Sequence, residues 1–162
     1  MLILRSRFLV PEKCNFKGVY VIVNARNQKC YVGSSKNIRN RILQHMSQLR
    51  NNKSPVSEMQ KDYNDGDNFI FHVVLKYHET SMEKHKNKND LLALEGKAIK
   101  AYDAVKNGYN KDDALGMLSY EHDIFYSRIY TREIIDYVNG VDDEEPHIKL
   151  WTEYDEEHKE MN

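Results

Sequence analysis

Residues 18–33, GVYVIVNARNQKCYVG, contain two glycine–tyrosine clusters, GVY and YVG, separated by ten residues. The strand-forming runs at 19–24 and 30–34 are joined by Ala-Arg-Asn-Gln-Lys, which predicts an antiparallel hairpin. A turn centred on residues 26–27 pairs residues whose numbers sum to 53, so Tyr20 faces Gly33 and Tyr31 is its diagonal neighbour. A slip of one residue would separate the two tyrosines. This register predicts that both phenols emerge from one side of a sheet.

A helix is expected to follow the hairpin, capped by Ser35 or Asn37 and ending near Arg50. Its apolar residues recur at helical spacing and form one stripe: Ile38, Ile42, Met46 and Leu49. His45 lies within this stripe, and Arg41 lies one turn before it on the flank. A single histidine in such a stripe fits a buried core residue as well as a site residue.

The rest of the chain predicts a mixed α/β (α+β) domain with further helices and one more strand. In chain order we expect a weaker helix over 56–63, a strand over 69–77, a charged loop at 84–89, a helix capped by Asn89 or Asp90 and closed by GYN at 108–110, and a helix over 120–138.

Glu95 lies in an unusual place within the segment LLALEGKAIKAY. On a helical wheel it falls on the apolar face, one turn from both Leu91 and Ile99. Burying an ionised carboxylate without compensation is costly, and either a paired arginine or a divalent cation would compensate it. A structural ion pair and a metal site are both consistent with this position.

The charge of the chain is divided unevenly along its 162 residues. Residues 1–111 contain 20 Lys+Arg and 10 Asp+Glu, whereas residues 112–162 contain 4 Lys+Arg and 15 Asp+Glu. A basic body suits a polyanionic partner such as nucleic acid, although a solvated lysine-rich surface would give the same count. Any nucleic-acid surface is therefore expected in the first two thirds of the chain.

The composition also excludes several classes of protein. No apolar run exceeds five residues, which predicts no membrane-spanning helix, and Arg5 and Arg7 interrupt what would be the apolar part of a secretion signal. Cys14 and Cys30 form neither a disulfide framework nor a CxxC zinc motif. We therefore expect an intracellular protein in a reducing compartment.

These residues together suggest a type of chemistry. Two tyrosines on one sheet face, the Arg41/His45 pair and an inward Glu95 supply a proton acceptor, a cation for phosphate and a metal ligand. Phosphodiester hydrolysis requires an activated water, neutralisation of phosphate charge and stabilisation of the leaving oxygen.

The chain resembles the GIY-YIG endonucleases over residues 18–110. The resemblance lies in the ordered set GVY at 18–20, YVG at 31–33, SSKNIRNRILQH at 34–45, the inward Glu95 and the closing Asn110. It implies a three-stranded antiparallel sheet flanked by helices. We accordingly expect a nuclease domain at 18–111, an N-terminal extension at 1–17 and an acidic, helical C-terminal extension at 112–162.

The resemblance also implies the site and its substrate, DNA. It assigns catalytic roles by position to Tyr20, Tyr31, Arg41, His45, Glu95 and Asn110. It implies a single divalent cation, Mg²⁺ or Mn²⁺, held by Glu95. Tyr20 is the preferred general base and Tyr31 its rival or a water-orienting group, and Gly33 is expected to let the backbone pass close to the substrate.

The chain departs from the family pattern in places, and its role has two alternatives. Some members have a lysine directly after YxG, where this chain has Ser34. A homing or a restriction-type enzyme is the leading reading, and the alternative is a nucleic-acid-binding or interaction module that keeps the fold without cleaving. The acidic extension would then be an autoinhibitor or a homodimer element.

Overall fold

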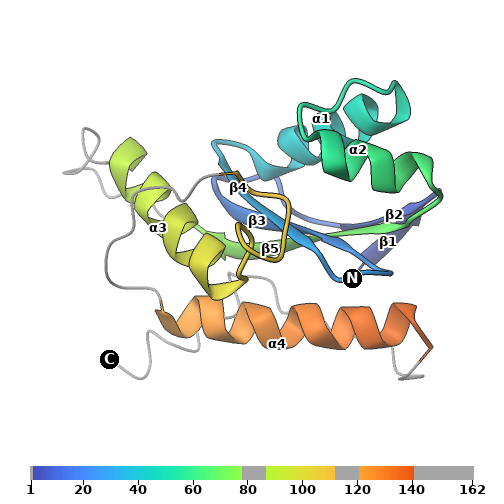
Figure 1. Cartoon of the computed structure of the whole chain (residues 1–162). Helices are drawn as coiled ribbons and strands as arrows, with labels where there is room; N and C mark the ends of the chain where they lie inside the picture. Colours follow the sequence, from blue (N-terminus) through green and yellow to red (C-terminus); the bar gives the residue numbers. More distant parts are fainter. Residues whose placement is uncertain (1, 78–86, 112–120, 141–162) are drawn as a thin grey trace.

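In a computed structural model, one mixed sheet separates two groups of helices (Figure 1). The structure describes residues 2–77, 87–111 and 121–140. The five strands are β1 (Leu2–Arg5), β2 (Phe8–Pro11), β3 (Gly18–Asn24), β4 (Cys30–Ser35) and β5 (Phe69–Lys76). Their order across the sheet is β1-β2-β5-β3-β4. The α/β class expected from the sequence is confirmed.

The central strand β3 is buried along its whole length because it is paired on both sides and covered on both faces. It pairs antiparallel with β4 and with β5, which gives the expected three-stranded antiparallel sheet. The pairing of β3 with β4 places Tyr20 opposite Gly33 and Ile22 opposite Tyr31. The predicted register is therefore confirmed residue by residue.

Two further strands extend this sheet beyond the three that the sequence predicted. Residues 2–11, which we had placed in an N-terminal extension, form the antiparallel hairpin β1–β2. This hairpin joins the sheet through parallel pairing of Phe8 with Phe69 and of Leu9 with Ile70. The buried Phe8 ring stacks on Tyr63, so the N-terminal hairpin contributes to the hydrophobic core.

Helices α1 (Ile38–Arg50) and α2 (Ser57–Asn64) cover one face of the sheet (Figure 1). Asn37 caps α1 by accepting a hydrogen bond from the Asn40 amide at 3.1 Å, as one of the two expected caps. The predicted apolar stripe of α1 is buried, and His45 is buried with it. This packing fixes α1 over the strands that carry the two tyrosines.

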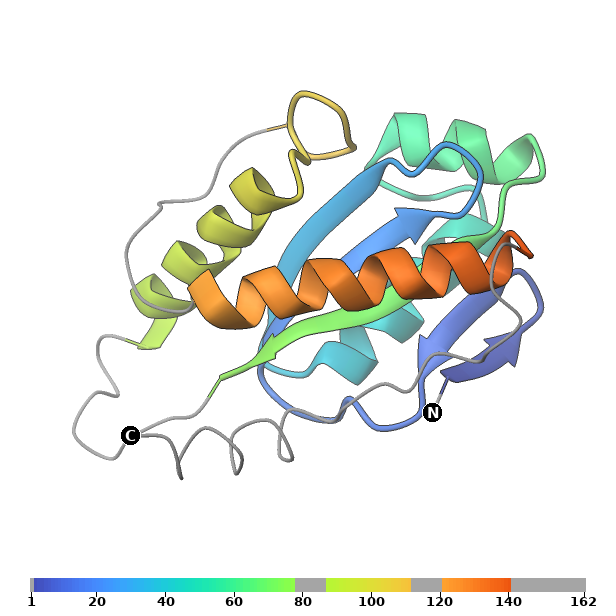
Figure 2. The ribbon, with the colours of Figure 1, turned by 90° about the horizontal axis from the view of Figure 1, so that it is seen from below.

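Helices α3 (Asn87–Ala101) and α4 (Glu121–Val138) lie on the other side of the sheet (Figures 1 and 2). Helix α3 begins at Asn87, so part of the loop expected at 84–89 is helical. It packs against β4 and β3 and brings Glu95 toward the edge of the sheet. No helix of the described residues has the length and apolarity needed to cross a bilayer.

Helix α4 crosses the sheet face opposite α1 and α2 (Figure 2). Ile134 and Ile135 are buried, and the Thr131 hydroxyl shares a hydrogen bond of 2.9 Å with the hydroxyl of Tyr102, the residue that follows α3. The side chains of Ile124 and Phe125 lie outside the described residues. Among the described residues of the apolar stripe, Ile134 and Ile135 are buried, whereas Ile129 and Val138 are 41% and 38% exposed. Burial of the two isoleucines within the chain removes the main argument for a homodimer, which the described residues do not support. The hypothesis that the acidic extension is autoinhibitory stays a prediction, since residues 112–120 and 141–162 lie outside the described part.

Truncation after Asp113 should destabilise the protein, because it removes α4 and exposes the sheet face beneath it. Each buried isoleucine contributes about 1.5–3 kcal/mol, so loss of Ile134 and Ile135 alone should cost several kcal/mol. Urea unfolding and the soluble fraction on expression measure the effect. Truncation after Gly140 keeps α4 and is the matched control, expected to remain folded. A stable, soluble truncate ending at Asp113 would show that α4 is dispensable.

Candidate active site

Tyr20 and His45 form the buried centre of the site, and each is 1% exposed. The Tyr20 hydroxyl and His45 Nε2 share a hydrogen bond of 2.8 Å. Burial, followed by the Arg41 charge, lowers the pKa of His45 to about 3, so its imidazole is neutral near pH 7. Burial also raises the pKa of Tyr20, so its phenol is protonated in the resting protein. The two rings therefore form a neutral hydrogen-bonded pair.

Tyr31 is a second aromatic neighbour of the same histidine. Its ring centroid is 5.5 Å from that of His45, and the Tyr20 centroid is 5.6 Å from it, both in edge-on geometry. Both tyrosines therefore emerge from one face of the sheet, as the register predicted. Tyr31 is only half-buried, so it is the more accessible of the two phenols.

Arg41 is the cation of this cluster. Its charge lowers the pKa of four neighbouring groups, at each of which burial has the larger effect. At Tyr20, Tyr31 and Glu95 the charge opposes burial. At His45 it adds to the effect of burial. Its Nη1 donates to Gln44 Oε1 at 2.5 Å, which fixes one edge of the guanidinium. Favouring the phenolate form of two tyrosines is the electrostatic effect that a tyrosine base requires.

Gly33 makes room for Tyr20. A Cβ added at Gly33 would lie 2.5 Å from the Tyr20 hydroxyl oxygen and 2.7 Å from its Cζ. Such a contact would force the ring, and with it the hydrogen bond to His45, out of place. We expected Gly33 to let the substrate come close to the backbone. The structure shows that packing of Tyr20 already requires a glycine at this position.

Glu95 reaches this cluster from α3, across the edge of the sheet. It is half-buried rather than fully inward, and Ser34 Oγ donates to its Oε2 at 2.9 Å. Burial raises the pKa of Glu95, and the Ser34 hydrogen bond opposes this shift. Glu95 forms no ion pair with a described residue, so the alternative of a structural ion pair has no support in that part of the chain.

Asn110 lies beside the backbone of the edge strand β4. Its Oδ1 accepts from the Val32 amide at 2.7 Å, and its Nδ2 donates to the Val32 carbonyl at 2.8 Å. The Tyr109 amide donates to the Cys30 carbonyl at 2.8 Å, so these two residues continue the pairing that an edge strand lacks. Asn110 therefore holds the segment between Tyr31 and Gly33 in place and contacts neither tyrosine hydroxyl through its amide.

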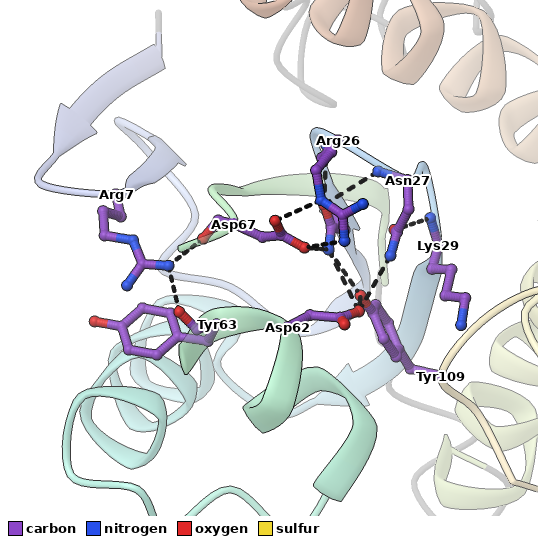
Figure 3. A network of polar contacts seen from close by, with 9 residues as sticks. Arg7, Arg26, Asn27, Lys29, Asp62, Tyr63, Asp67 and Tyr109 are labelled. Atoms are coloured by element: carbon purple, nitrogen blue, oxygen red, sulfur yellow. Dashed lines mark hydrogen bonds and ion pairs between the residues drawn. The ribbon is translucent and has the colours of Figure 1, made fainter. Parts of the chain in front are cut away.

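Tyr109 and Asn110 together clamp the backbone of β4, and a polar network ties this clamp to the rest of the domain (Figure 3). The Tyr109 hydroxyl donates to Asp62 Oδ2 at 2.6 Å and accepts from Asn24 Nδ2 at 3.0 Å. Asn24 also donates to Asp67 Oδ2 at 2.8 Å. Burial and the hydrogen bond to Asp62 raise the pKa of Tyr109, so it remains a donor. The network links β3, the end of α2 and the segment that carries Asn110.

Arg26 completes the network from the β3–β4 turn, as Figure 3 shows. Its guanidinium binds both carboxylate oxygens of Asp67, at 2.6 and 2.9 Å. This hydrogen bonding lowers the pKa of Asp67. Asn24 Oδ1 accepts from the Arg26 amide at 2.9 Å and fixes the turn itself. The turn of the hairpin is thus held by side chains far apart in the sequence.

The donors fit a hydrated divalent cation held by one carboxylate. No group of three or more His, Cys, Asp or Glu residues in the described part of the chain could enclose a metal ion. Mg²⁺ commonly keeps several waters and binds through one or two carboxylates together with substrate phosphates. Glu95 offers one such carboxylate, with Oε2 bonded to Ser34 and Arg41 close enough to act on it electrostatically.

Five of the six predicted site residues are therefore brought together, and the sixth, Asn110, supports them through the backbone. Sequence reasoning missed Ser34 as a partner of Glu95, and it missed the network around Asn24 and Tyr109. The turn residues Asn24 and Asp67 carried a local signal, because asparagine and aspartate favour turns. Their pairing across 43 positions carried none.

The lowered pKa of His45 predicts a pH-dependent stability. Between about pH 3 and the ordinary histidine pKa near 6.5, the unfolded chain binds a proton that the folded chain does not, so stability falls as the pH falls. His45→Gln keeps a hydrogen-bonding group but cannot titrate, and it should remove a slope of about 1.4 kcal/mol per pH unit between pH 6 and pH 5. Urea unfolding at both pH values measures this difference. Identical slopes in the two proteins would contradict a buried neutral His45.

Comparisons with known proteins agree with this geometry. Residues 16–110 match the model of the GIY-YIG catalytic domain. A mutant of the catalytic domain of intron endonuclease I-TevI is similar at a TM-score of 0.53 and 26% identity, over 62% of this chain and 98% of that chain. The catalytic domain of homing endonuclease I-TevI gives 0.48 and 28%, over 60% and 99%. No curated protein matches at a significant level. With more than half of its length matched by the family model, the chain belongs to the GIY-YIG endonuclease family.

Proposed function

We propose that this protein is a divalent-metal-dependent endonuclease that hydrolyses phosphodiester bonds of DNA with a tyrosine as general base. The observation that carries the proposal is the convergence of Tyr20, Tyr31, Arg41, His45 and Glu95 at one edge of the sheet. The relatives named above are an intron or homing endonuclease, which supports DNA as the substrate. The buried Cys14 and Cys30 are present as thiols, which is consistent with action inside a reducing cell.

Tyr20 is the preferred base because its hydroxyl has a neutral acceptor in contact, His45 Nε2, 2.8 Å away. In the tautomer protonated at Nδ1, this nitrogen accepts the hydrogen bond from the phenol. As the Tyr20 oxygen takes a proton from the attacking water, the phenolic proton passes to Nε2, so His45 ends the step as an imidazolium. Arg41 favours the phenolate and opposes the raised pKa that burial imposes. Tyr31, half-buried beside the same histidine, is suited to orient the water.

Arg41 also suits the scissile phosphate. A guanidinium presents donors in a planar fork that matches two phosphate oxygens. Within the described part of the chain, Nη1 donates to Gln44, and the guanidinium also interacts with Tyr20 and Tyr31. In the reaction a water oxygen bonds to phosphorus, the P–O bond to the leaving oxygen breaks, and the water proton passes to the base. The phosphate gains charge toward the transition state, where a fixed cation contributes most.

Glu95 is the residue that would hold the divalent cation, with Ser34 bonded to its Oε2. When bound there, the cation supplies charge stabilisation to the phosphate and to the leaving oxygen. A non-cleaving binding module would not need the charge of Glu95, because this half-buried carboxylate forms no ion pair with a described residue.

Glu95→Gln should abolish cleavage and leave the fold intact, because it removes the ligand charge at nearly constant shape. Plasmid and single-stranded DNA are incubated with the wild-type protein and the variant in Mg²⁺ or in EDTA. The wild type should cut only with Mg²⁺, and the variant should not cut in either condition. Mg²⁺-dependent cutting by the variant at the wild-type rate would remove Glu95 from the mechanism, and an inactive wild type would favour the binding module.

Tyr20→Phe should lower the cleavage rate by about 10²–10⁴-fold, the usual contribution of a general base, and Tyr31→Phe should lower it less. Tyr31→Phe is the matched control, since it removes the same hydroxyl from the second aromatic neighbour of His45. Single-turnover rates on a cleavable duplex give the comparison. If Tyr31→Phe lowers the cleavage rate more than Tyr20→Phe, Tyr31 is the base. Equal, mild losses of rate would show that both tyrosines serve only in packing.

A further inference from the structure

Ser34 follows the YVG sequence directly and is the one described residue whose side chain donates a hydrogen bond to Glu95. The bond joins Ser34 Oγ to Glu95 Oε2 at 2.9 Å, within the normal range for a hydroxyl donor. Ser34 lies in β4, two residues beyond Val32, which the Asn110 amide clamps on both backbone atoms. The hydroxyl is thus carried by a part of the strand whose position is fixed.

This contact selects one oxygen of the carboxylate. A glutamate side chain has three rotatable bonds, and Glu95 is only half-buried on α3, so packing alone does not fix its carboxyl group. A hydrogen bond from a fixed donor to Oε2 sets the rotation of that group. A site that depends on a single protein carboxylate is more sensitive to its orientation than a site enclosed by several ligands.

We infer that Ser34 is a positioning residue that holds Oε2 of Glu95 and presents Oε1 to a hydrated divalent cation. The inference rests on the proposed function, in which Glu95 is the cation ligand. It goes beyond that proposal by assigning the residue that orients the ligand. Where some family members carry a lysine, this chain uses an uncharged donor, which orients the carboxylate without adding a cation that would compete with the metal.

The neighbouring Ser35 is a matched control. Its hydroxyl accepts from the Asn37 amide at 3.1 Å and donates to the Asn37 carbonyl at 2.9 Å, so it serves the turn before α1. Among the described residues, its hydroxyl forms hydrogen bonds with Asn37 and none with Glu95. Ser35→Ala therefore removes the same group one position away and leaves the carboxylate undisturbed.

The experiment is a titration of the full-length protein with Mn²⁺, in which electron paramagnetic resonance measures the free ion. Ser34→Ala should raise the Kd for Mn²⁺ by about tenfold, the lower end of the usual effect of losing a group that orients a metal ligand. Ser35→Ala should leave the Kd unchanged, and Ser34→Thr, which keeps the hydroxyl, should stay close to the wild type. Thermal unfolding in EDTA confirms that each variant is folded.

A second readout separates positioning from a general loss of structure. For Ser34→Ala, the Mg²⁺ concentration that gives half-maximal cleavage should rise, and the rate at saturating Mg²⁺ should remain near that of the wild type. If Glu95→Gln weakens Mn²⁺ binding and Ser34→Ala does not, the inference about Ser34 is overturned and the proposed function stands. If Glu95→Gln binds Mn²⁺ as the wild type does, the assignment of Glu95 as ligand fails as well.

Discussion

The pairing of Tyr20 with Gly33 across β3 and β4 is the constraint on which the site depends. The phenol of Tyr20 occupies the space where a side chain at position 33 would lie, and from there its hydroxyl reaches His45. The fit requires a large side chain at position 20 of the buried central strand and no side chain at position 33 of the edge strand. A slip of one residue in the hairpin would turn Tyr31 to the other face and open the space that Tyr20 fills.

Because β4 is an edge strand, nothing within the sheet holds its outer side. Asn110 and Tyr109 supply that support through the backbone of residues 30–32. Tyr109 is in turn held by Asn24 and Asp62, so the clamp is tied back to the strand that carries Tyr20. A buried network of this kind is stabilising only when its members are satisfied, which makes the hairpin, α2 and the segment at 102–110 interdependent.

The parts of this structure that sequence predicted are those set by local pattern. The hairpin register follows from turn position and strand length, and the stripe of α1, with His45 inside it, follows from helical period. The β1–β2 hairpin was missed because its strands are four residues each and its attachment to β5 joins segments some 60 positions apart. The same reason applies to Asn110, whose type and place were recognised but whose partner, the Val32 backbone, is 78 positions away. Helical period placed Glu95 inward, but it cannot say that the edge of the sheet leaves the carboxylate half-exposed.

The electrostatics of the resting site explain why its chemistry depends on what binds there. Burial raises the pKa of both tyrosines and lowers that of His45, so the groups that would exchange protons are all neutral near pH 7. Arg41 lowers the pKa of both tyrosines and so favours the phenolate, but burial remains the larger effect. In the proposed mechanism, additional positive charge near the phenols would favour the phenolate, and Glu95 is the described carboxylate that would hold a cation there. Activation of the tyrosine would then be coupled to cation binding, because burial keeps the phenol protonated in the resting protein.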